Sequence, residues 1–435
     1  MVYHTKVADH GQPQSPKAAP AWLYNMGRVT QRLATQPLFL VIITLALLVL
    51  GDGLAPVSAT ATAEQQTIPD ATVYLPLIMT QGKGTAPRTG FSLTSAALSR
   101  YPAAAQLGAG WYLDWQVQIA PERPNDIAYA QMIRVHQKLA CGAWYHADDK
   151  VCPYATPLDY VYRPDQATIV AAAQNNPGSL WFIGNEMDRI DWAYCAEWET
   201  PTHCKTIAYN GQDEILPETY AVAYHDLYQI IKTADPTARV AIGGVIQATP
   251  LRLQYLTKIW DSYQTTYSTT MPVDVWNVHN FIIREKAKDW GADIPPGVNA
   301  QEGAYIGPNI THIDMTIFDQ QIRAFRQWMK ERGQQEKALV VSEYGVLYPN
   351  GLMGLPDQPE PIQTFMVNTF DYFYQTQDCA LGMPGDACRL VQQWNWYSLD
   401  DTWGNFNIHS RLFDPTTTQI TATGERFRRY LAEAP

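Results

Sequence analysis

Two apolar stretches that each end in a carboxylate decide the fold: LWFIGNE (180–186) and LVVSEYG (339–345). Both are short and rich in β-branched and aromatic residues, as strands are when both faces of a parallel sheet are covered. Burying an ionisable side chain in such a run costs several kcal/mol unless the group is paired or used. We therefore expect Glu186 and Glu343 at the ends of two buried strands, with a functional role. The alternative is a structural salt bridge.

Six further runs of the same kind precede, separate and follow these two. They lie at 90–94, 110–115, 128–135, 239–247, 273–281 and 390–397. Between them, 218–235 and 314–333 carry apolar residues at intervals of three and four, which predicts helices. Eight strand-to-helix repeats predict an α/β fold, a (β/α)8 TIM barrel. An open doubly wound sheet is the alternative, but its glycine-rich phosphate turn is missing after the first run.

The longest connections follow strands, at 136–164, 187–217, 282–313 and 346–360. In a barrel these loops gather at the carboxyl ends of the strands, where active sites lie. We therefore expect a single catalytic domain over 89–435, with long loops around its site.

The amino-terminal region predicts export. A run of 13 largely apolar residues at 38–50 is too short for a membrane-spanning helix, which takes about 20 residues. Small residues follow at 59–63, so we interpret 1–63 as a secretory signal region and 64–88 as a linker or extension. The alternative is a protein that stays membrane-anchored through 38–50. A net charge of −11 disfavours a nucleic-acid partner.

The cysteines are consistent with an oxidising compartment. Six cysteines fall into three close pairs. The pairs are Cys141 with Cys152, Cys195 with Cys204, and Cys379 with Cys388. Even number and proximity favour three local disulfides, although six cysteines allow 15 connectivities. No zinc-ligand spacing occurs, so we expect no metal and no cofactor. The last pair falls between a helix and the final strand, where we expect a structural role only.

Two carboxylates facing one cavity suit the cleavage of a glycosidic bond. One carboxyl keeps its proton and donates it to the leaving oxygen, while the other is ionised and attacks the anomeric carbon. Apolar walls and a neighbouring negative charge can hold one proton in place near neutral pH.

The motifs GNE (184–186) and SEYG (342–345) resemble the signature of the clan A retaining glycoside hydrolases, over about residues 90–430. This clan includes cellulases, mannanases, galactanases, β-glucanases and xylosidases. By that resemblance Glu186 is the general acid and base, Glu343 the nucleophile, and Asn185 a donor to the sugar 2-hydroxyl. The resemblance also places His279 near the nucleophile, and Trp394 or Trp396 at the floor of the central subsite.

The sequence departs from the clan at two positions. Met187 stands where many members have proline, and Phe281 stands where a tyrosine commonly donates to the nucleophile. Tyr344 or Tyr397 could replace that tyrosine. Asp114 and Trp111, at the second strand, could line the cleft.

These observations predict a secreted, monomeric retaining hydrolase of β-linked polysaccharides or oligosaccharides. The alternative, which the two departures motivate, is a non-catalytic sugar-binding or scaffold protein on the same barrel.

Overall fold

The computed structural model describes residues 88–94, 97–140, 153–190, 194–195, 207–208, 212–289, 291–307, 311–348, 350–401 and 408–433. The chain divides into two units, Met1–Val73 and Tyr74–Pro435, and all described residues belong to the second. The signal region and nearly all of the linker lie outside the described residues and stay predictions. Within the described part of the chain, no helix combines the length and the apolar character that crossing a membrane requires.

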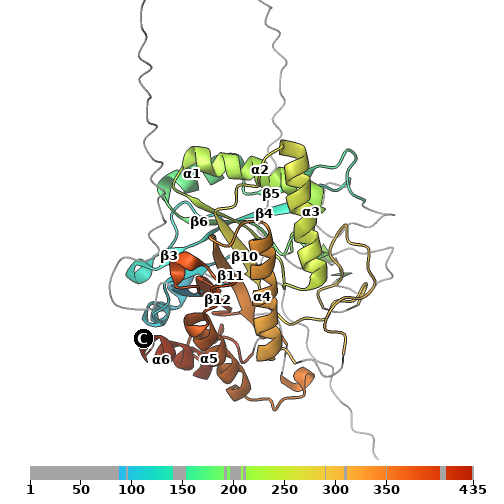
Figure 1. Ribbon diagram of the computed structural model, residues 1–435. Helices are drawn as coiled ribbons and strands as arrows, with labels where there is room; N and C mark the ends of the chain where they lie inside the picture. The colour runs from blue at the N-terminus through green and yellow to red at the C-terminus, as the bar shows by residue number, and fades with distance from the viewer. Residues whose placement is uncertain are drawn as a thin grey trace, which may run out of the picture. The chain divides into compact units, whose positions relative to one another are not determined.

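A curled sheet of ten strands forms the centre of the fold (Figure 1). Its order is β3-β2-β1-β12-β11-β10-β9-β6-β4-β5. The strands are β1 (Thr89–Ser92), β2 (Trp111–Leu113), β3 (Ala128–Tyr129), β4 (Gln131–Gln137), β5 (Tyr160–Arg163), β6 (Leu180–Asn185), β9 (Arg239–Gly244), β10 (Val275–His279), β11 (Ala338–Gly345) and β12 (Gln393–Tyr397). All neighbours are parallel except β4 and β5. A separate antiparallel pair joins β7 (Tyr194–Cys195) to β8 (Ile207–Ala208).

Every strand run expected from the sequence is present. The third run is divided by Ala130 into β3, which pairs with β2, and β4, which pairs with β6. The last strand, β12, pairs with the first, β1. Mixed α/β architecture with a parallel-dominated sheet is therefore confirmed.

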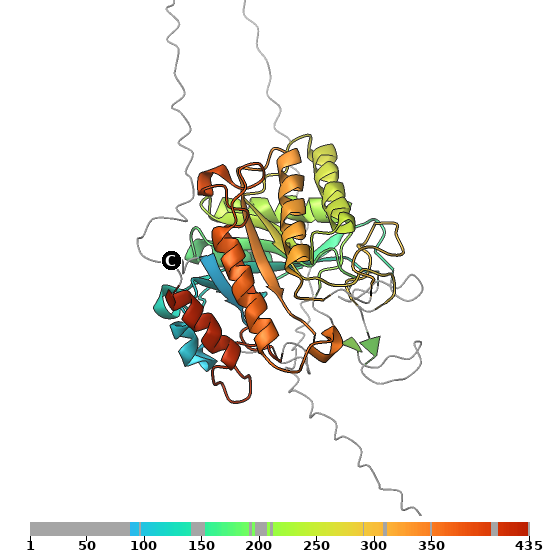
Figure 2. The same ribbon diagram turned by 60° about the horizontal axis from the view of Figure 1, so that its bottom comes forward.

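Helices follow the later strands but not the first two. They are α1 (Gln166–Asn175), α2 (Pro217–Ala234), α3 (Pro250–Tyr267), α4 (Met315–Glu331), α5 (Glu360–Gln375) and α6 (Ala422–Glu433). The described residues between β1, β2 and β3 form only the short 3-10 helices Leu98–Arg100, Pro102–Gln106 and Pro124–Asp126. Helices α2 and α4 confirm the two helical periodicities, and α5 and α6 pack side by side (Figure 2).

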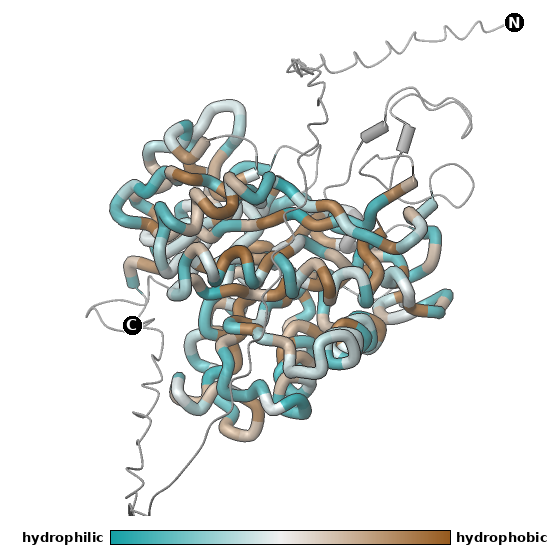
Figure 3. The backbone as a smooth tube through the Cα atoms, turned by 90° about the horizontal axis from the view of Figure 1, so that it is seen from above, coloured by the Kyte–Doolittle hydropathy of each residue, from teal (hydrophilic) through white to brown (hydrophobic). Residues whose placement is uncertain are grey.

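Two apolar layers stabilise this arrangement. Residues on the inner side of the strands form one cluster, and residues between the strands and the helices form a larger one. Figure 3 shows apolar segments along the backbone of the described part of the chain. The inner cluster consists of Trp111, Leu113, Ala130, Met132, Leu180, Phe182, Ala241, Val275, Ala338 and Val340. Because strands are buried on both faces, they read as continuous apolar runs in the sequence.

The amino-terminal ends of the strands carry structural features. Cys379 and Cys388 form a disulfide between α5 and β12, as expected. A cavity of about 140 Å³ lies at the same ends, and Trp111 and Arg239 line it. Trp111 is buried, and its indole N–H donates to the Arg88 carbonyl at 3.1 Å. The expectation that Trp111 binds substrate is therefore wrong, because its side chain lies at the amino-terminal ends of the strands, opposite their carboxyl ends.

The other two cysteine pairs cannot be compared with the structure. Cys141, Cys152 and Cys204 lie outside the described residues, and for Cys195 only the backbone is described. Both disulfides remain predictions.

Candidate functional site

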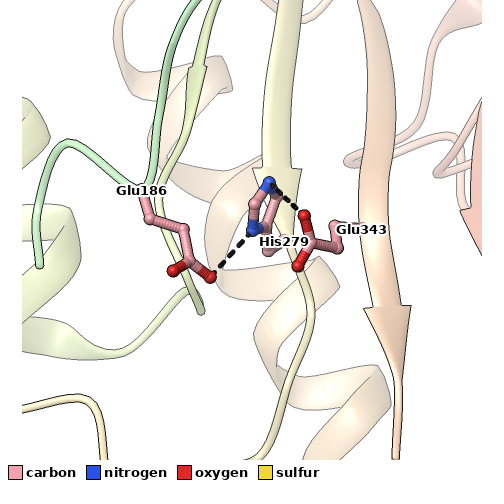
Figure 4. A group of neighbouring side chains, drawn as sticks. All are labelled: Glu186, His279 and Glu343. Atoms are coloured by element: carbon pink, nitrogen blue, oxygen red, sulfur yellow. Dashed lines mark hydrogen bonds and ion pairs between the residues drawn. The ribbon is translucent and has the colours of Figure 1, made fainter. Parts of the chain in front are cut away.

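Glu186, His279 and Glu343 meet at the carboxyl ends of three strands (Figure 4). Glu186 directly follows β6, His279 ends β10, and Glu343 lies near the end of β11, in register with His279. A carboxylate oxygen from each glutamate and a ring nitrogen of His279 all lie within 4.8 Å of one another. All three residues are buried. The strand ends thus unite two acids that are 157 positions apart (343 minus 186).

Local backbone features place these side chains. Glu186 has a φ of 48°, a left-handed conformation that is uncommon outside glycine, and its N–H donates to the Gly244 carbonyl at 2.9 Å. Gly244 on β9 also makes room for His279, since a Cβ at this position would lie 2.4 Å from the imidazole Cδ2. A register shift beside His279 completes the arrangement.

Glu186 is held by Arg189 and His279. Arg189 donates from Nη1 to Oε2 at 2.9 Å, and His279 Nδ1 lies 3.2 Å from Oε1. Burial raises the pKa of Glu186, but Arg189 and His279 together outweigh burial and lower this pKa to about 2. Glu186 is therefore ionised at neutral pH. The sequence analysis did not predict a role for Arg189. Its position three residues after Glu186 was the signal that could have indicated an ion pair within one turn.

Glu343 has weaker partners. The Trp115 indole N–H donates to its Oε2 at 3.2 Å, and also lies 3.1 Å from Asn185 Oδ1. His279 Nε2 is 3.9 Å away. Burial raises the pKa of Glu343, His279 and Trp115 lower it, and the charge of Glu186 raises it, so that the resulting pKa is about 7.

The two carboxyls therefore divide one proton near neutral pH, and Glu343 holds most of it. This distribution is the reverse of the one that the resemblance assigns, in which Glu186 is the acid. The physical reason is Arg189, which stabilises a negative charge on Glu186. His279 lies between the two carboxylates (Figure 4). Burial lowers the His279 pKa, but the two glutamates outweigh burial and raise it.

Aromatic rings border the carboxylates. Tyr397 lies 5.8 Å from Trp115 and 6.2 Å from Phe281, measured between ring centroids, and Phe281 also packs edge-on against His279. The Tyr397 hydroxyl hydrogen-bonds Asp401 rather than Glu343. The N–H that reaches Glu343 thus comes from a tryptophan, where the clan pattern led us to expect a tyrosine hydroxyl.

Three other expected binding residues face away from the site. Trp394 packs against Phe373 and Tyr374 of α5, at ring distances of 4.8 and 4.7 Å. Trp396 and Tyr344 contact each other at 5.4 Å, and all three are completely buried between sheet and helices. The expectation that they contact substrate is wrong, because alternation along β11 and β12 directs them outward.

Asp114 belongs to a different hydrogen-bonded group. Its carboxylate accepts from the Tyr129 hydroxyl and the Gln118 amide, and burial raises its pKa. None of its hydrogen bonds among the described residues reaches Glu186, His279 or Glu343. The structure therefore does not place Asp114 at the carboxylate pair.

A buried clamp supports the loop that carries Arg189. Arg252 on α3 pairs with Asp188 at 3.2 Å and with Glu285 at 2.9 Å. These side chains are fully buried. Since Asp188 follows β6 and Glu285 follows β10, the clamp fixes two loops beside the site to one helix.

The donor set of Glu186, His279 and Glu343 could in principle hold a metal ion. A cation there would stand beside the guanidinium of Arg189, already 2.9 Å from Glu186. Repulsion between the two cations makes the group a poorer fit for a metal than for a shared proton.

Similarity to known proteins is found among solved structures. No protein-family model matches the sequence, and no curated protein matches it. Among solved structures, the chain is similar to a GH128 endo-β-1,3-glucanase from Pseudomonas viridiflava, with 12% identity, a TM-score of 0.45, and coverage of 79% of this chain and 97% of that one. A GH128 endo-β-1,3-glucanase from Amycolatopsis mediterranei, in complex with laminarihexaose, has 10% identity, a TM-score of 0.43, and coverage of 79% and 99%.

A GH128 oligosaccharide-binding protein from Cryptococcus neoformans has 13% identity, a TM-score of 0.44, and coverage of 82% and 100%. GH128 is a clan A family, the clan whose signature the two glutamate motifs resemble.

Proposed function

We propose that this protein is a secreted glycoside hydrolase that cleaves β-glycosidic bonds of a polysaccharide or oligosaccharide with retention of configuration. The observation that carries the proposal is the meeting of Glu186 and Glu343 at the carboxyl ends of β6 and β11, with oxygens within 4.8 Å. Retaining enzymes hold their carboxyl groups about 5–5.5 Å apart, and inverting enzymes about 6.5–9.5 Å. The close approach here favours retention.

The scaffold supports this proposal. Pairing runs from β1 through β2 to β3, passes Ala130 into β4, and returns through β6, β9, β10 and β11 to β12, which pairs with β1. We infer a closed (β/α)8 barrel from this ring, with its first two helices reduced to 3-10 turns. The carboxylates then stand at the carboxyl end of the barrel, where such enzymes act.

Glu186 donates a proton to the leaving oxygen and Glu343 attacks the anomeric carbon. Before attack, the proton must pass from Glu343 to Glu186. His279 can relay it: Nε2 takes the Glu343 proton while the Nδ1 proton moves to Glu186. The 3.9 Å between Nε2 and Glu343 needs only a small approach for this transfer.

The test is isosteric substitution of each acid. Glu186→Gln and Glu343→Gln should each reduce release of reducing sugar from a polysaccharide panel by at least about a thousandfold. Asp114→Asn is the matched control, because this carboxylate lies near the second strand end but outside the pair. Full activity in both glutamine variants would disprove the proposal.

A second candidate is a sugar-binding protein without turnover. Two observations favour it: Phe281 supplies no hydroxyl beside His279, and Arg189 already pairs with Glu186. In that case the purified wild-type protein binds oligosaccharides on a glycan array, yet releases no reducing sugar from any bound ligand.

Export is part of the proposal. Cleavage after Ala63 predicts a mature protein that begins at residue 64. Amino-terminal sequencing of protein recovered from the medium checks this, and a membrane-retained chain would favour an uncleaved anchor at 38–50.

A further inference from the structure

Arg189 is the cation closest to Glu186 that carries a permanent charge. Its Nη1 donates to Glu186 at 2.9 Å and its Nη2 donates to the Gly291 carbonyl at 3.1 Å. Its Nε is buried and has no hydrogen-bond acceptor among the described residues. The side chain is 17% exposed. Arg189 thus has a neutral partner, an ionised partner and a buried Nε without an acceptor among the described residues.

The proposed mechanism changes the charge of the ionised partner. When Glu186 takes up a proton, it can no longer neutralise Arg189. The other nearby carboxylate among the described residues, Asp188, faces Arg252 at 3.2 Å, and the Gly291 carbonyl carries no net charge. A largely buried guanidinium without a counter-charge is strongly unfavourable. Within the described part of the chain, protonation of Glu186 therefore leaves Arg189 in need of a new anion.

We propose that the substrate supplies this anion: Arg189 binds a carboxylate or sulfate group on the sugar that occupies the site, so the substrate class is an acidic glycan. This inference rests on the proposed hydrolase function. Nη1 becomes available as it leaves Glu186, and Nη2 beside it carries a second N–H, so the edge of the guanidinium formed by Nη1 and Nη2 can face the incoming anion. Guanidinium donors of this kind suit planar carboxylates and sulfate oxygens.

A neutral sugar would not have the same effect. Its hydroxyl groups could accept from Nη1, but they would leave the positive charge of Arg189 uncompensated. Glu186 would then remain ionised and could not donate to the leaving oxygen. Binding of the acidic group and release of Glu186 are thus one coupled event.

Matched substrates test this inference. Aryl β-glucuronides and β-galacturonides differ from the corresponding glucoside and galactoside only in the carboxylate at carbon 6, and 6-sulfated aryl glycosides form a third set. The wild-type protein should have a kcat/KM at least about tenfold higher for an acidic member than for its neutral counterpart. The carboxylate and sulfate sets distinguish the two sources of the anion.

Variants identify the residue responsible. Arg189→Met should reduce the acidic-to-neutral ratio of kcat/KM to about one, and Arg189→Lys should retain part of it because the charge remains. Arg323→Met is the matched control, since Arg323 on α4 also pairs with carboxylates, Asp319 and Asp378, but far along the chain from the site. An unchanged ratio in Arg189→Met, with unchanged thermal melting, would overturn the inference.

Calorimetric binding separates this inference from the proposed function, because it needs no turnover. Glucuronate, galacturonate and glucose 6-sulfate are titrated into the wild-type protein and the Arg189→Met variant, each beside its neutral sugar. Tighter binding of an acidic sugar that disappears in Arg189→Met supports the inference even if no substrate is hydrolysed, a result that would refute only the hydrolase. Equal binding of acidic and neutral sugars throughout refutes the role of Arg189, whatever the turnover.

Discussion

At the scale of single residues, the Trp115 indole controls how readily Glu343 ionises. Its N–H donates to Glu343 Oε2 at 3.2 Å and lowers a pKa that burial raises. Trp115→Phe should therefore raise the pKa of Glu343. Because the proton on Glu343 is the one passed to Glu186, the basic limb of kcat/KM should move to higher pH by about one unit. A pH–rate profile measures this shift. A basic limb that stays in place or moves to lower pH would contradict it.

The sequence predicted some residues of the site for a clear physical reason. Parallel strands bring their carboxyl ends together, so Glu186 and Glu343 could be placed from strand boundaries. Asn185 and His279 were added by the resemblance to clan A. Orientation within a strand could not be predicted in the same way. Strands covered on both faces have no polar alternation, and β11 shifts register between Val341 and Tyr344. The sequence therefore did not predict which side chains of β11 point inward and which point outward.

At the scale of elements, the close approach of β9 and β10 depends on Gly244. A Cβ there would lie 2.4 Å from Cδ2 and 2.6 Å from Nε2 of His279. Gly244→Ala should displace the imidazole from Glu186 and reduce kcat by at least about tenfold. Steady-state kinetics check this. Gly307→Ala is the control, because a Cβ at Gly307 meets no atom within 4 Å. Equal kcat in both variants would contradict the role of Gly244.

Helix α3 contributes Arg252, which links two loops. Arg252→Met leaves Asp188 and Glu285 buried without their cation, so the free energy of unfolding should fall by about 3–5 kcal/mol. Urea denaturation measures this. Arg323→Met removes a half-exposed pair instead and should cost only about 0–1 kcal/mol. Similar losses in both variants would show that burial of the clamp has no special effect.

At the scale of the whole molecule, Glu343 should make stability depend on pH. Its pKa is about 7 in the folded protein and about 4.3 in an unfolded chain, so its stabilising contribution is complete below pH 4 and is lost as pH rises through 7. Relative to Glu343→Gln, the wild-type protein should lose on the order of 3 kcal/mol between pH 4 and 8.

Urea denaturation of both proteins across this range measures the difference. Glu186 acts in a separate window, because its lowered pKa gives stability that is present above about pH 4.3 and is lost toward pH 2. A constant difference between wild type and Glu343→Gln from pH 4 to 8 would contradict the raised pKa of Glu343.

We expect the disulfide between Cys379 and Cys388 to stabilise the fold and to have no part in catalysis. Cys379 and Cys388 close a loop of nine residues before β12, at the opposite end of the strands from Glu343. Replacing both with serine should lower the free energy of unfolding by about 2–3 kcal/mol and leave kcat unchanged. Denaturation and kinetics on the double variant check the two parts separately. A changed kcat at temperatures where the variant is fully folded would contradict this division.

The sequence predicted the order of strands and the helices α2 and α4, since both follow from apolar periodicity. It did not reveal that the first two connections hold only 3-10 turns. Pro102 and Pro124 stand at the first positions of two of these turns, where proline suits a true helix equally well. Contacts between distant loops, such as that of Arg189 with Gly291, needed the folded chain.

Strands β3 and β4 are joined directly through Ala130. They pair with different neighbours, β3 with β2 and β4 with β6, so the register of one strand fixes the register of the other. Inserting one residue at this point would reverse the side chains of one half, bringing Met132 to the helix side and Ile133 to the interior. Natural variation in length should therefore concentrate in the loops that follow the strands. Extra residues there change the shape of the proposed glycan-binding site without altering the register of the sheet.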